Sequence, residues 1–297
     1  MVVTIGVKPF ILVGGLIVFL YLLFRWAFEP TTPQWQACPI VQPDSDAFFA
    51  KQENLFNTQC ANKNKKPLNW TQFAKRVLRT KELWKGARNI RKKDNEGFGD
   101  FNADFKRLLP RIFETSQRNV IRIIELGSFK GRSTIEMARQ CQELARESDK
   151  ECQILAVDTW LASPEHYEAE RDDISNLYEI FLSNIRHEDL TQVVFPFRLT
   201  STAAAHVLHC YHINADVVFV DSNHEYDTVI SELLMYYPLL RPHGLFIGDD
   251  FHIKTWPGVV QAVEEFAQKT SRPYEVVRNT WSLFKGDEPE NYFWDKQ

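Results

Sequence analysis

A turn with two glycines follows the apolar run that opens residues 120–134, VIRIIELGSFKGRST. Gly127 and Gly131 lack a Cβ and can bring the backbone close to a bound ligand, and Ser133 can cap the helix that follows. Glu125 adds negative charge beside the turn. The spacing is neither the GxGxxG of dinucleotide binding nor that of a phosphate loop. The turn therefore suits a cationic or hydroxyl-bearing ligand better than a pyrophosphate.

An acidic residue also ends the next apolar run, ILAVDTW, at residues 154–160. Asp158 lies 33 residues after Glu125, at the end of the second expected strand. At this place in an α/β sheet, an acidic side chain can accept hydrogen bonds from ribose hydroxyls. A glycine turn followed by an acid-tipped second strand predicts a nucleoside ligand.

The elements that would position these residues alternate between strand and helix patterns. We expect strands at residues 120–126, 153–158, 193–199, 215–221, 244–249, 274–278 and 281–285. We expect helices at residues 133–147, 172–186, 202–211, 225–240 and 257–269. Several strands are nearly continuous in Val, Ile, Leu and Phe, as strands covered on both faces must be. The alternation predicts an α/β fold with a mostly parallel seven-stranded sheet and helices on both faces.

Five segments resemble the class I S-adenosylmethionine-dependent methyltransferases, in the branch of macrocin-type sugar O-methyltransferases and cephalosporin-hydroxylase-like proteins. They are IIELGSFKGRST, AVDTWLASPEHY, VVFVDSNHEYDTV, LLRPHGLFIGDDF and WPGVVQAVEEF, in the family's order across residues 110–287. The resemblance implies a Rossmann-like fold and S-adenosylmethionine as cofactor. It also implies a set of cofactor-binding residues: Glu125, Gly127, Ser128, Gly131, Asp158 on the ribose, and Asp221.

Three carboxylates gather at the carboxyl ends of the fourth and fifth expected strands, with Asp221 on one strand and Asp249 and Asp250 on the next. Like charges this close need a cation, and oxygen ligands without cysteine suit Mg²⁺ or a similar divalent ion. Related metal-dependent O-methyltransferases place such an ion where the acceptor oxygen binds, and His224 matches the family histidine proposed as general base. The alternative is that these side chains are solvated caps of strands and of a helix.

The expected function is a divalent-metal-dependent O-methyltransferase that acts on a hydroxyl group, such as that of a sugar or glycoconjugate. One alternative is an oxygen-dependent hydroxylase of the cephalosporin-hydroxylase-like type, which would need an iron site such as two histidines and a carboxylate. Another is a non-catalytic cofactor-binding membrane protein. The net charge of −4 and the pI near 6.1 indicate no nucleic-acid partner. The oligomeric state is not indicated.

The beginning of the chain is strongly apolar. Residues 9–28, PFILVGGLIVFLYLLFRWAF, contain an uncharged stretch nearly long enough to span a bilayer as a helix. This predicts a transmembrane signal anchor at residues 1–28, with a cleaved signal peptide or a buried core helix as alternatives. We expect a single-pass protein of the endoplasmic reticulum or Golgi with a lumenal catalytic domain, where the triplet Asn69-Trp70-Thr71 can accept a glycan.

The rest of the chain divides by composition. Residues 29–68 are proline-rich and are expected to form a stem. Residues 69–297 form the expected methyltransferase domain, with its core at 110–287. An expected basic amphipathic helix at 69–93 opens it, and this helix either packs against the domain or meets a membrane surface or an anionic partner.

The five cysteines lack the CxxC spacing of a zinc or redox site. Cys38 with Cys60, and Cys141 with Cys152, are the two candidate bridges. A group of possible metal ligands falls within one expected helix: His206, His209, Cys210 and His212. The apolar pattern of that helix is ordinary, so we favour a structural surface over a metal site.

Overall fold

The structure is a computed structural model that describes residues 60, 66–86, 93–94, 96–97, 100–169 and 171–292. The predicted membrane helix at residues 1–28 and nearly all of the predicted stem at residues 29–68 lie outside these residues, so both stay predictions. Within the described part of the chain, no helix is both long and apolar enough to cross a membrane.

One sheet of seven strands runs through the described residues in the order β3-β2-β1-β4-β5-β7-β6. Strands β1 to β5 are parallel, whereas β7 is antiparallel to both of its neighbours, β5 and β6. The strands are β1 (Val120–Leu126), β2 (Glu151–Asp158), β3 (Val194–Arg198), β4 (Ala215–Val220), β5 (Leu240–Gly248), β6 (Tyr274–Val277) and β7 (Thr280–Phe284). The predicted mostly parallel, seven-stranded sheet is confirmed.

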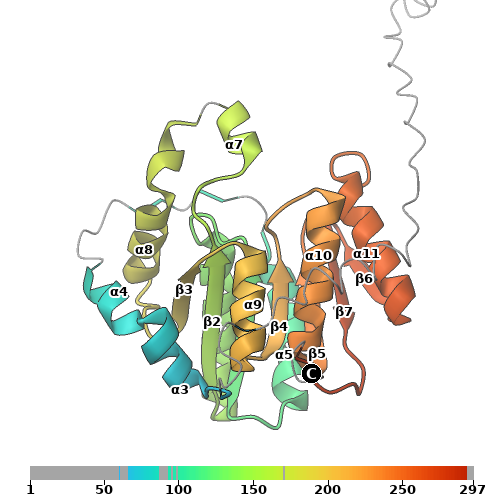
Figure 1. Ribbon diagram of the computed structural model, residues 1–297, viewed down its shortest axis with the longest axis horizontal. Coiled ribbons are helices and arrows are strands. Elements are labelled where there is room, and N and C mark those ends of the chain that lie inside the picture. The colour runs from blue at the N-terminus through green and yellow to red at the C-terminus, as the bar shows by residue number, and fades with distance from the viewer. Residues whose placement is uncertain are drawn as a thin grey trace, which may run out of the picture. The chain divides into compact units, whose positions relative to one another are not determined.

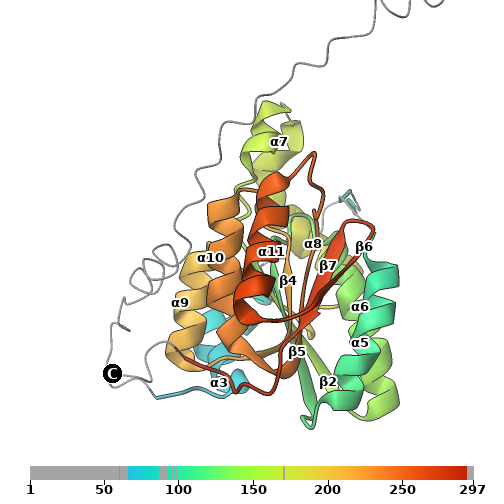
Figure 2. The same cartoon turned by 90° about the vertical axis from the view of Figure 1, so that its right-hand side faces the viewer.

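Helices cover both faces of this sheet (Figures 1 and 2). In Figure 2, α9 (Ser201–Tyr211), α10 (Tyr226–Tyr236) and α11 (Pro257–Thr270) lie on one side, and α5 (Asn102–Thr115) and α6 (Arg132–Ser148) lie on the other. Helix α8 (Leu177–His187) shares a buried apolar cluster with α5 and α6. Because both faces are covered, every residue of β4 is buried, which explains why its sequence is apolar except for Asp216.

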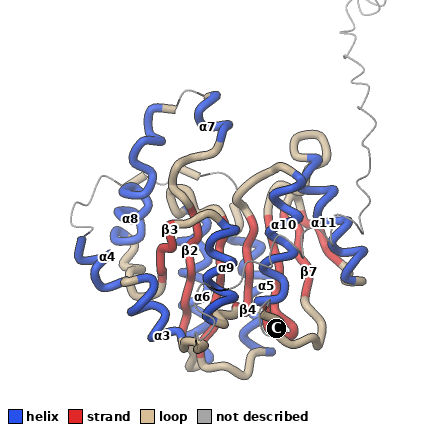
Figure 3. Tube along the Cα trace, in the orientation of Figure 1, coloured by secondary structure: helices blue, strands red, loops and turns tan. Residues whose placement is uncertain are grey.

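The loops after the strands rise above one edge of the sheet. The loop after β2 carries the short helix α7 (Pro164–Glu168) and a 3₁₀ turn, η2 (Asp172–Asn176), before α8 begins. Figure 3 shows this loop and the loop between β5 and α11 above the same edge. The carboxyl ends of parallel strands meet there, so these loops are placed to enclose a ligand.

Helix α5 was not among the expected helices. Its Pro110 lies inside the helix, where proline removes a backbone hydrogen bond and ordinarily signals a break. Phe105, Leu109 and Ile112 recur on one face and are completely buried. The burial of this face compensates for the missing hydrogen bond.

The prediction of one continuous helix at residues 69–93 is wrong. The chain forms α3 (Trp70–Phe73), a π-helical turn η1 (Ala74–Leu78) and α4 (Thr80–Gly86), and Arg79 between them has φ 50°. The first turn is buried through Trp70, whose ring packs edge-on at 5.1 Å from that of Phe195. Packing against the domain, one of the two alternatives, is confirmed for this turn.

The helix expected at residues 225–240 is shorter than its pattern indicated. Helix α10 ends at Tyr236, and a 3₁₀ turn, η3 (Tyr237–Leu239), follows it. Pro238 cannot donate the backbone hydrogen bond that would continue the α-helix. Strand β5 consequently begins at Leu240 and not at residue 244.

Two disulfides join the described cysteines. Cys141 and Cys152 are bonded, so this candidate bridge between α6 and β2 is confirmed. The candidate bridge from Cys38 to Cys60 is wrong, because Cys60 is bonded to Cys210 at the end of α9. The backbone explains this choice: Leu68 N–H donates to the carbonyl of Tyr211, which holds the segment before α3 beside α9.

Candidate active site

A cavity of about 670 Å³ lies at the carboxyl ends of the strands. Its walls bring together most of the residues that the sequence singled out: Gly127, Ser128, Asp158, Asp221, His224, Asp249 and Asp250. Glu125, near the end of β1, and Gly131, in the turn after β1, do not belong to its lining. The cavity therefore joins the expected cofactor residues to the expected acid cluster.

Glu125 is completely buried beneath the glycine turn. Its carboxylate accepts hydrogen bonds from the hydroxyls of Ser128 at 2.6 Å, Ser133 at 2.7 Å and Thr134 at 2.5 Å. Burial raises its pKa to about 7, against the opposing effect of these three hydroxyls. Glu125 thus shapes the turn from below, and Ser133 binds this carboxylate and is not the helix cap that was expected.

The two glycines are required by the protein's own packing. Gly127 has φ 83°, and a Cβ there would come within 2.0 Å of the carbonyl oxygen of Asp221. Gly131 has φ 91°, and a Cβ there would come within 3.0 Å of the ring of Phe181. The turn after β1 can therefore approach β4 and α8 closely because neither position carries a side chain.

Asp158 holds the glycine turn from the cavity side. Its Oδ2 accepts hydrogen bonds from the backbone N–H groups of Ser128 and Phe129, both at 2.8 Å, and its Oδ1 accepts one from Trp160 at 2.6 Å. A carboxylate offers about four lone-pair directions, so these contacts still leave acceptor capacity for the hydroxyls of a ligand. Ribose binding by Asp158 stays a prediction. The structure adds a second role, in which Asp158 holds the glycine turn in place.

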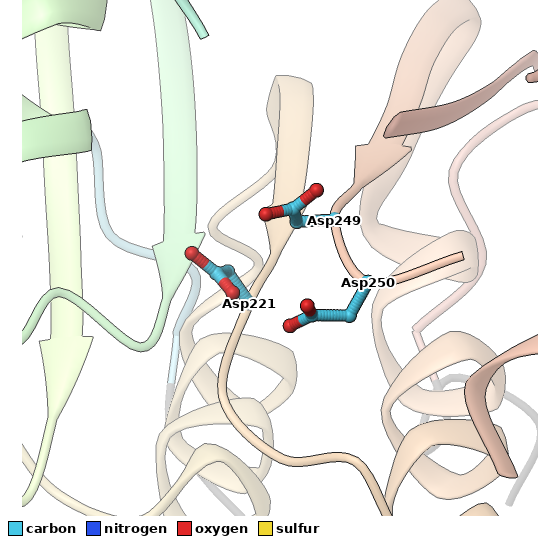
Figure 4. Close-up of side chains that lie close together, drawn as sticks. All are labelled: Asp221, Asp249 and Asp250. Carbon is cyan, nitrogen blue, oxygen red and sulfur yellow. The ribbon is translucent and has the colours of Figure 1, made fainter. Parts of the chain in front are cut away.

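The three aspartates of the acid cluster, Asp221, Asp249 and Asp250, converge from β4 and β5 on a common space (Figure 4). One oxygen of each lies within 4.8 Å of the others, and this is the one group of three or more metal-ligand side chains within the described residues. The loops after two adjacent parallel strands bring these residues together despite the 28 positions that separate Asp221 from Asp249 in the sequence.

Electrostatics in the acid cluster favours a bound cation. Burial and the neighbouring charges of Asp249 and Asp250 hold the pKa of Asp221 well above its usual range. Burial, assisted by the charge of Asp250, raises the pKa of Asp249 to about 6. Gathering these carboxylates therefore costs free energy while they are charged, and a divalent ion would remove that cost. Three oxygen donors without sulfur fit Mg²⁺.

His224 lies on the cavity wall between two carboxylates. Its Nε2–H donates to Asp250 Oδ2 at 2.9 Å, Nδ1 lies 3.6 Å from Glu165 Oε1, and the ring stacks on Trp256 at 3.7 Å. Burial lowers the pKa of His224, but the hydrogen bond and charge of Asp250, together with Glu165, outweigh it and raise the net pKa. A neutral ring that donates from Nε2 presents Nδ1 as its proton acceptor.

Two further features of the cavity escaped the sequence analysis. Glu165 reaches His224 from α7, across the cavity, and no sequence pattern links the two residues. Lys130, in the glycine turn, is buried and forms ion pairs of 2.7 Å with Asp94 and with Glu96. These partners lie more than 30 residues away and before β1, so spacing alone could not have paired them.

The histidines of α9 do not form a metal site. His209 is buried, and its Nε2–H donates to the carbonyl of Met235 at 2.8 Å. Burial lowers its pKa to about 4. Cys210 is engaged in the disulfide with Cys60. His209 therefore belongs to the interior, and the expected surface position is wrong for this residue.

Comparison with known proteins gives one match to a family. The family model described as "Methyltransferase domain" matches residues 124–251, which hold the glycine turn, Asp158 and the acid cluster. A curated relative, the uncharacterized protein R132 of Acanthamoeba polyphaga mimivirus, is 21% identical over 160 residues. The match covers 53% of this chain and 64% of the relative, so the chain spans less than two thirds of that protein's length.

The solved structures that resemble the chain include O-methyltransferases. The O-methyltransferase from Bacillus cereus in complex with SAH is 17% identical, with a TM-score of 0.42, and the match covers 72% of this chain and 96% of that one. The O-methyltransferase TomG from Streptomyces achromogenes is 17% identical, with a TM-score of 0.45, and the match covers 73% of this chain and 95% of that one. CalS11, a calicheamicin methyltransferase, is 13% identical, with a TM-score of 0.47, and the match covers 82% of this chain and 94% of that one. At such low identities these likenesses concern the fold alone.

Proposed function

We propose that the chain is a class I S-adenosylmethionine-dependent methyltransferase and that it transfers the methyl group to a hydroxyl oxygen held beside the acid cluster. The observation that carries this proposal is that one cavity joins the Asp158-held glycine turn to the three aspartates and His224. A nucleoside-binding turn alone would serve many chemistries, whereas a nearby cation site and a proton acceptor suit the ionisation of a hydroxyl group.

The charge of the cavity suits the cofactor. Six acidic side chains line it, against three basic ones, Lys130, Arg132 and Arg171; the acidic residues are Asp158, Glu165, Asp221, Glu232, Asp249 and Asp250. S-adenosylmethionine carries a sulfonium cation, which such a wall attracts, and its ribose offers two hydroxyl donors to Asp158. In this arrangement the backbone of Gly127 and Ser128 forms the wall beside the methionine part, and Glu125 supports that wall from beneath.

Asp158→Ala should weaken binding of S-adenosylmethionine about tenfold to a hundredfold, because hydrogen bonds from the ribose to a carboxylate are lost. Part of the loss should come from the turn, since Asp158 also accepts three backbone hydrogen bonds. Titration calorimetry on the wild type and the variant measures the change. Asp287→Ala is the control, because Asp287 is 96% exposed. Equal affinities would remove Asp158 from the cofactor site.

The acceptor side of the site rests on the acid cluster and His224. Asp221, Asp249 and Asp250 would hold Mg²⁺ or a similar ion, which lowers the pKa of a bound hydroxyl group and orients its oxygen. Bound S-adenosylmethionine would supply the methyl group: the hydroxyl oxygen would bond to the methyl carbon as the carbon–sulfur bond breaks, which would leave neutral S-adenosylhomocysteine. His224 accepts the hydroxyl proton at Nδ1, while Asp250 holds the ring through Nε2–H.

We further propose a sugar or glycoconjugate as acceptor and the lumen of the endoplasmic reticulum or Golgi as the compartment. The family branch suggests the sugar. The two disulfides favour the lumen, because disulfides persist in oxidising compartments and are rare in the cytosol. The direct test is to incubate the purified full-length protein with labelled S-adenosylmethionine, Mg²⁺ and a panel of glycans. Absence of label from every hydroxyl acceptor, with the cofactor bound, would count against O-methyl transfer.

Residues 29–297 should be protected from added protease in sealed microsomes, as expected for a lumenal domain. Asn69 should then carry a glycan, since it is exposed before α3 and only lumenal enzymes attach one. Gel mobility with and without glycosidase measures this, and Thr71→Ala is the matched control because it removes the acceptor triplet. Complete digestion of the domain without detergent would place it in the cytosol.

A further inference from the structure

The exposed apolar side chains are concentrated beside the cavity. In the part of the chain that the structure describes, four large hydrophobic side chains are exposed: Leu161 (61%), Tyr167 (61%), Ile253 (63%) and Tyr274 (37%). The first two belong to the loop after β2, Ile253 belongs to the loop between β5 and α11, and Tyr274 contacts Phe251 of that same loop. Both loops lie above the edge of the sheet that carries the cavity (Figure 3). Exposed apolar side chains that gather in one place mark an interaction surface.

The two loops meet at His224. Glu165, two residues before Tyr167, has a carboxylate oxygen 3.6 Å from Nδ1 of His224. Trp256, three residues after Ile253, stacks on the His224 ring at 3.7 Å. The segments that carry Tyr167 and Ile253 therefore both contact the proposed base. A molecule with its hydroxyl group at His224 extends out of the cavity between these segments.

Leu161, Tyr167 and Ile253 form an apolar rim that continues from the cavity wall. Leu161 directly precedes Ala162, which lines the cavity. The hydroxyl of Tyr167 donates to the carbonyl of Leu161 at 3.0 Å, which ties the two rim residues together. Because this bond engages the polar end of Tyr167, its exposed ring is left to make apolar contacts.

We propose that the apolar rim binds the alkyl chain of a neutral glycolipid whose sugar hydroxyl enters the cavity. This inference rests on the proposed function, because it takes the acceptor hydroxyl to lie beside the acid cluster. An alkyl chain that covers the rim removes apolar surface from water on both partners, which favours binding. The sugar alone is polar and would leave the rim exposed.

Charge and the start of the chain favour a neutral lipid-linked acceptor. Glu165 and Glu168, both exposed on α7, flank Tyr167 and would repel an anionic headgroup. The membrane segment predicted within residues 1–28 would hold the domain beside a bilayer, where acceptors with alkyl chains are found. These two features select a neutral glycolipid over an anionic lipid or a free sugar.

The test compares the methyl and octyl β-glycosides of glucose and of galactose as acceptors for the full-length protein with S-adenosylmethionine and Mg²⁺. The wild type should use the octyl glycoside at least about tenfold more efficiently in kcat/KM, because its chain covers the rim. Leu161→Ser combined with Ile253→Ser should lower this preference at least about fivefold, through the KM of the octyl glycoside. Lys254→Ser, at an exposed polar position beside Ile253, is the matched control and should keep the preference.

A second measurement does not depend on methyl transfer. An octyl glycoside with a diazirine at the end of its chain forms covalent adducts under illumination, and peptide mapping should locate them at residues 161–167 and 251–256. Adducts confined to other residues would contradict the inference, as would equal use of both glycosides or an unchanged preference in the double variant. Adducts at the rim without methyl transfer to any glycoside would support the rim and count against the proposed function.

Discussion

Asp249→Ala should lower methyl transfer by at least about a hundredfold and should abolish Mg²⁺ binding, while S-adenosylmethionine still binds. Removing one of three carboxylates leaves the ion under-coordinated. Substitution of residues that only support a metal's ligands already lowers metal affinity or activity about tenfold to a hundredfold. The cofactor contacts at Asp158 are separate from this change. Calorimetry with Mg²⁺ and with cofactor, beside the transfer assay, measures the three quantities, and Asp287→Ala is the exposed control.

Stability provides an independent check on the acid cluster. The pKa of Asp249 is about 6 in the folded protein and 3.8 as its ordinary value, so between these pH values the folded state binds more protons than the unfolded state. Without Mg²⁺, the contribution of Asp249 to the free energy of unfolding should fall as the pH rises through 6. At pH 7.5 in chelator, Asp249→Asn should therefore have a melting temperature at least as high as the wild type.

Two results would contradict the metal-dependent mechanism. One is methyl transfer that continues undiminished in excess chelator. The other is a clear loss of stability in Asp249→Asn without metal, which would indicate that the carboxylate serves the fold. In either case His224 could still act as the base of a metal-independent methyltransferase.

His224→Ala should slow methyl transfer by about 10² to 10⁴ at neutral pH, the usual contribution of a positioned base. Cofactor and Mg²⁺ should still bind, because His224 belongs to neither proposed binding set. His252→Ala is the matched control, since His252 is exposed on the loop after β5. A His224→Ala variant with the rate of the wild type would exclude the histidine as base.

The pH profile tests the same role. The base must be neutral, and Asp250 and Glu165 raise the pKa of His224 above its ordinary 6.5 despite burial. The wild-type kcat/KM should therefore rise with pH through that raised value. His224→Ala should lack this step and should gain rate only at higher pH, as the acceptor hydroxyl ionises without assistance. The same step in both proteins would assign it to another group.

The fold and the place of the site were largely predictable from the sequence. Nearly continuous apolar runs such as that of β4 predict covered parallel strands, and residues at the ends of parallel strands must share one edge of the sheet. That argument is enough to bring Asp158, Asp221 and Asp249 together. The argument works because strand periodicity and strand direction are local properties of the sequence. The position of the cavity follows from them without knowledge of which distant segments contact one another.

The tertiary structure determined which residues of the chain contact one another. Cys60 bonds to Cys210 because the backbone before α3 lies beside α9, and Glu125 serves the turn because three hydroxyls surround it. Gly127 is needed because the backbone of Asp221 and Ser222, directly after β4, packs against it. Each of these contacts depends on which segments are adjacent in the folded protein. Burial and close packing determine that adjacency, and the spacing of residues along the chain contains no information on either.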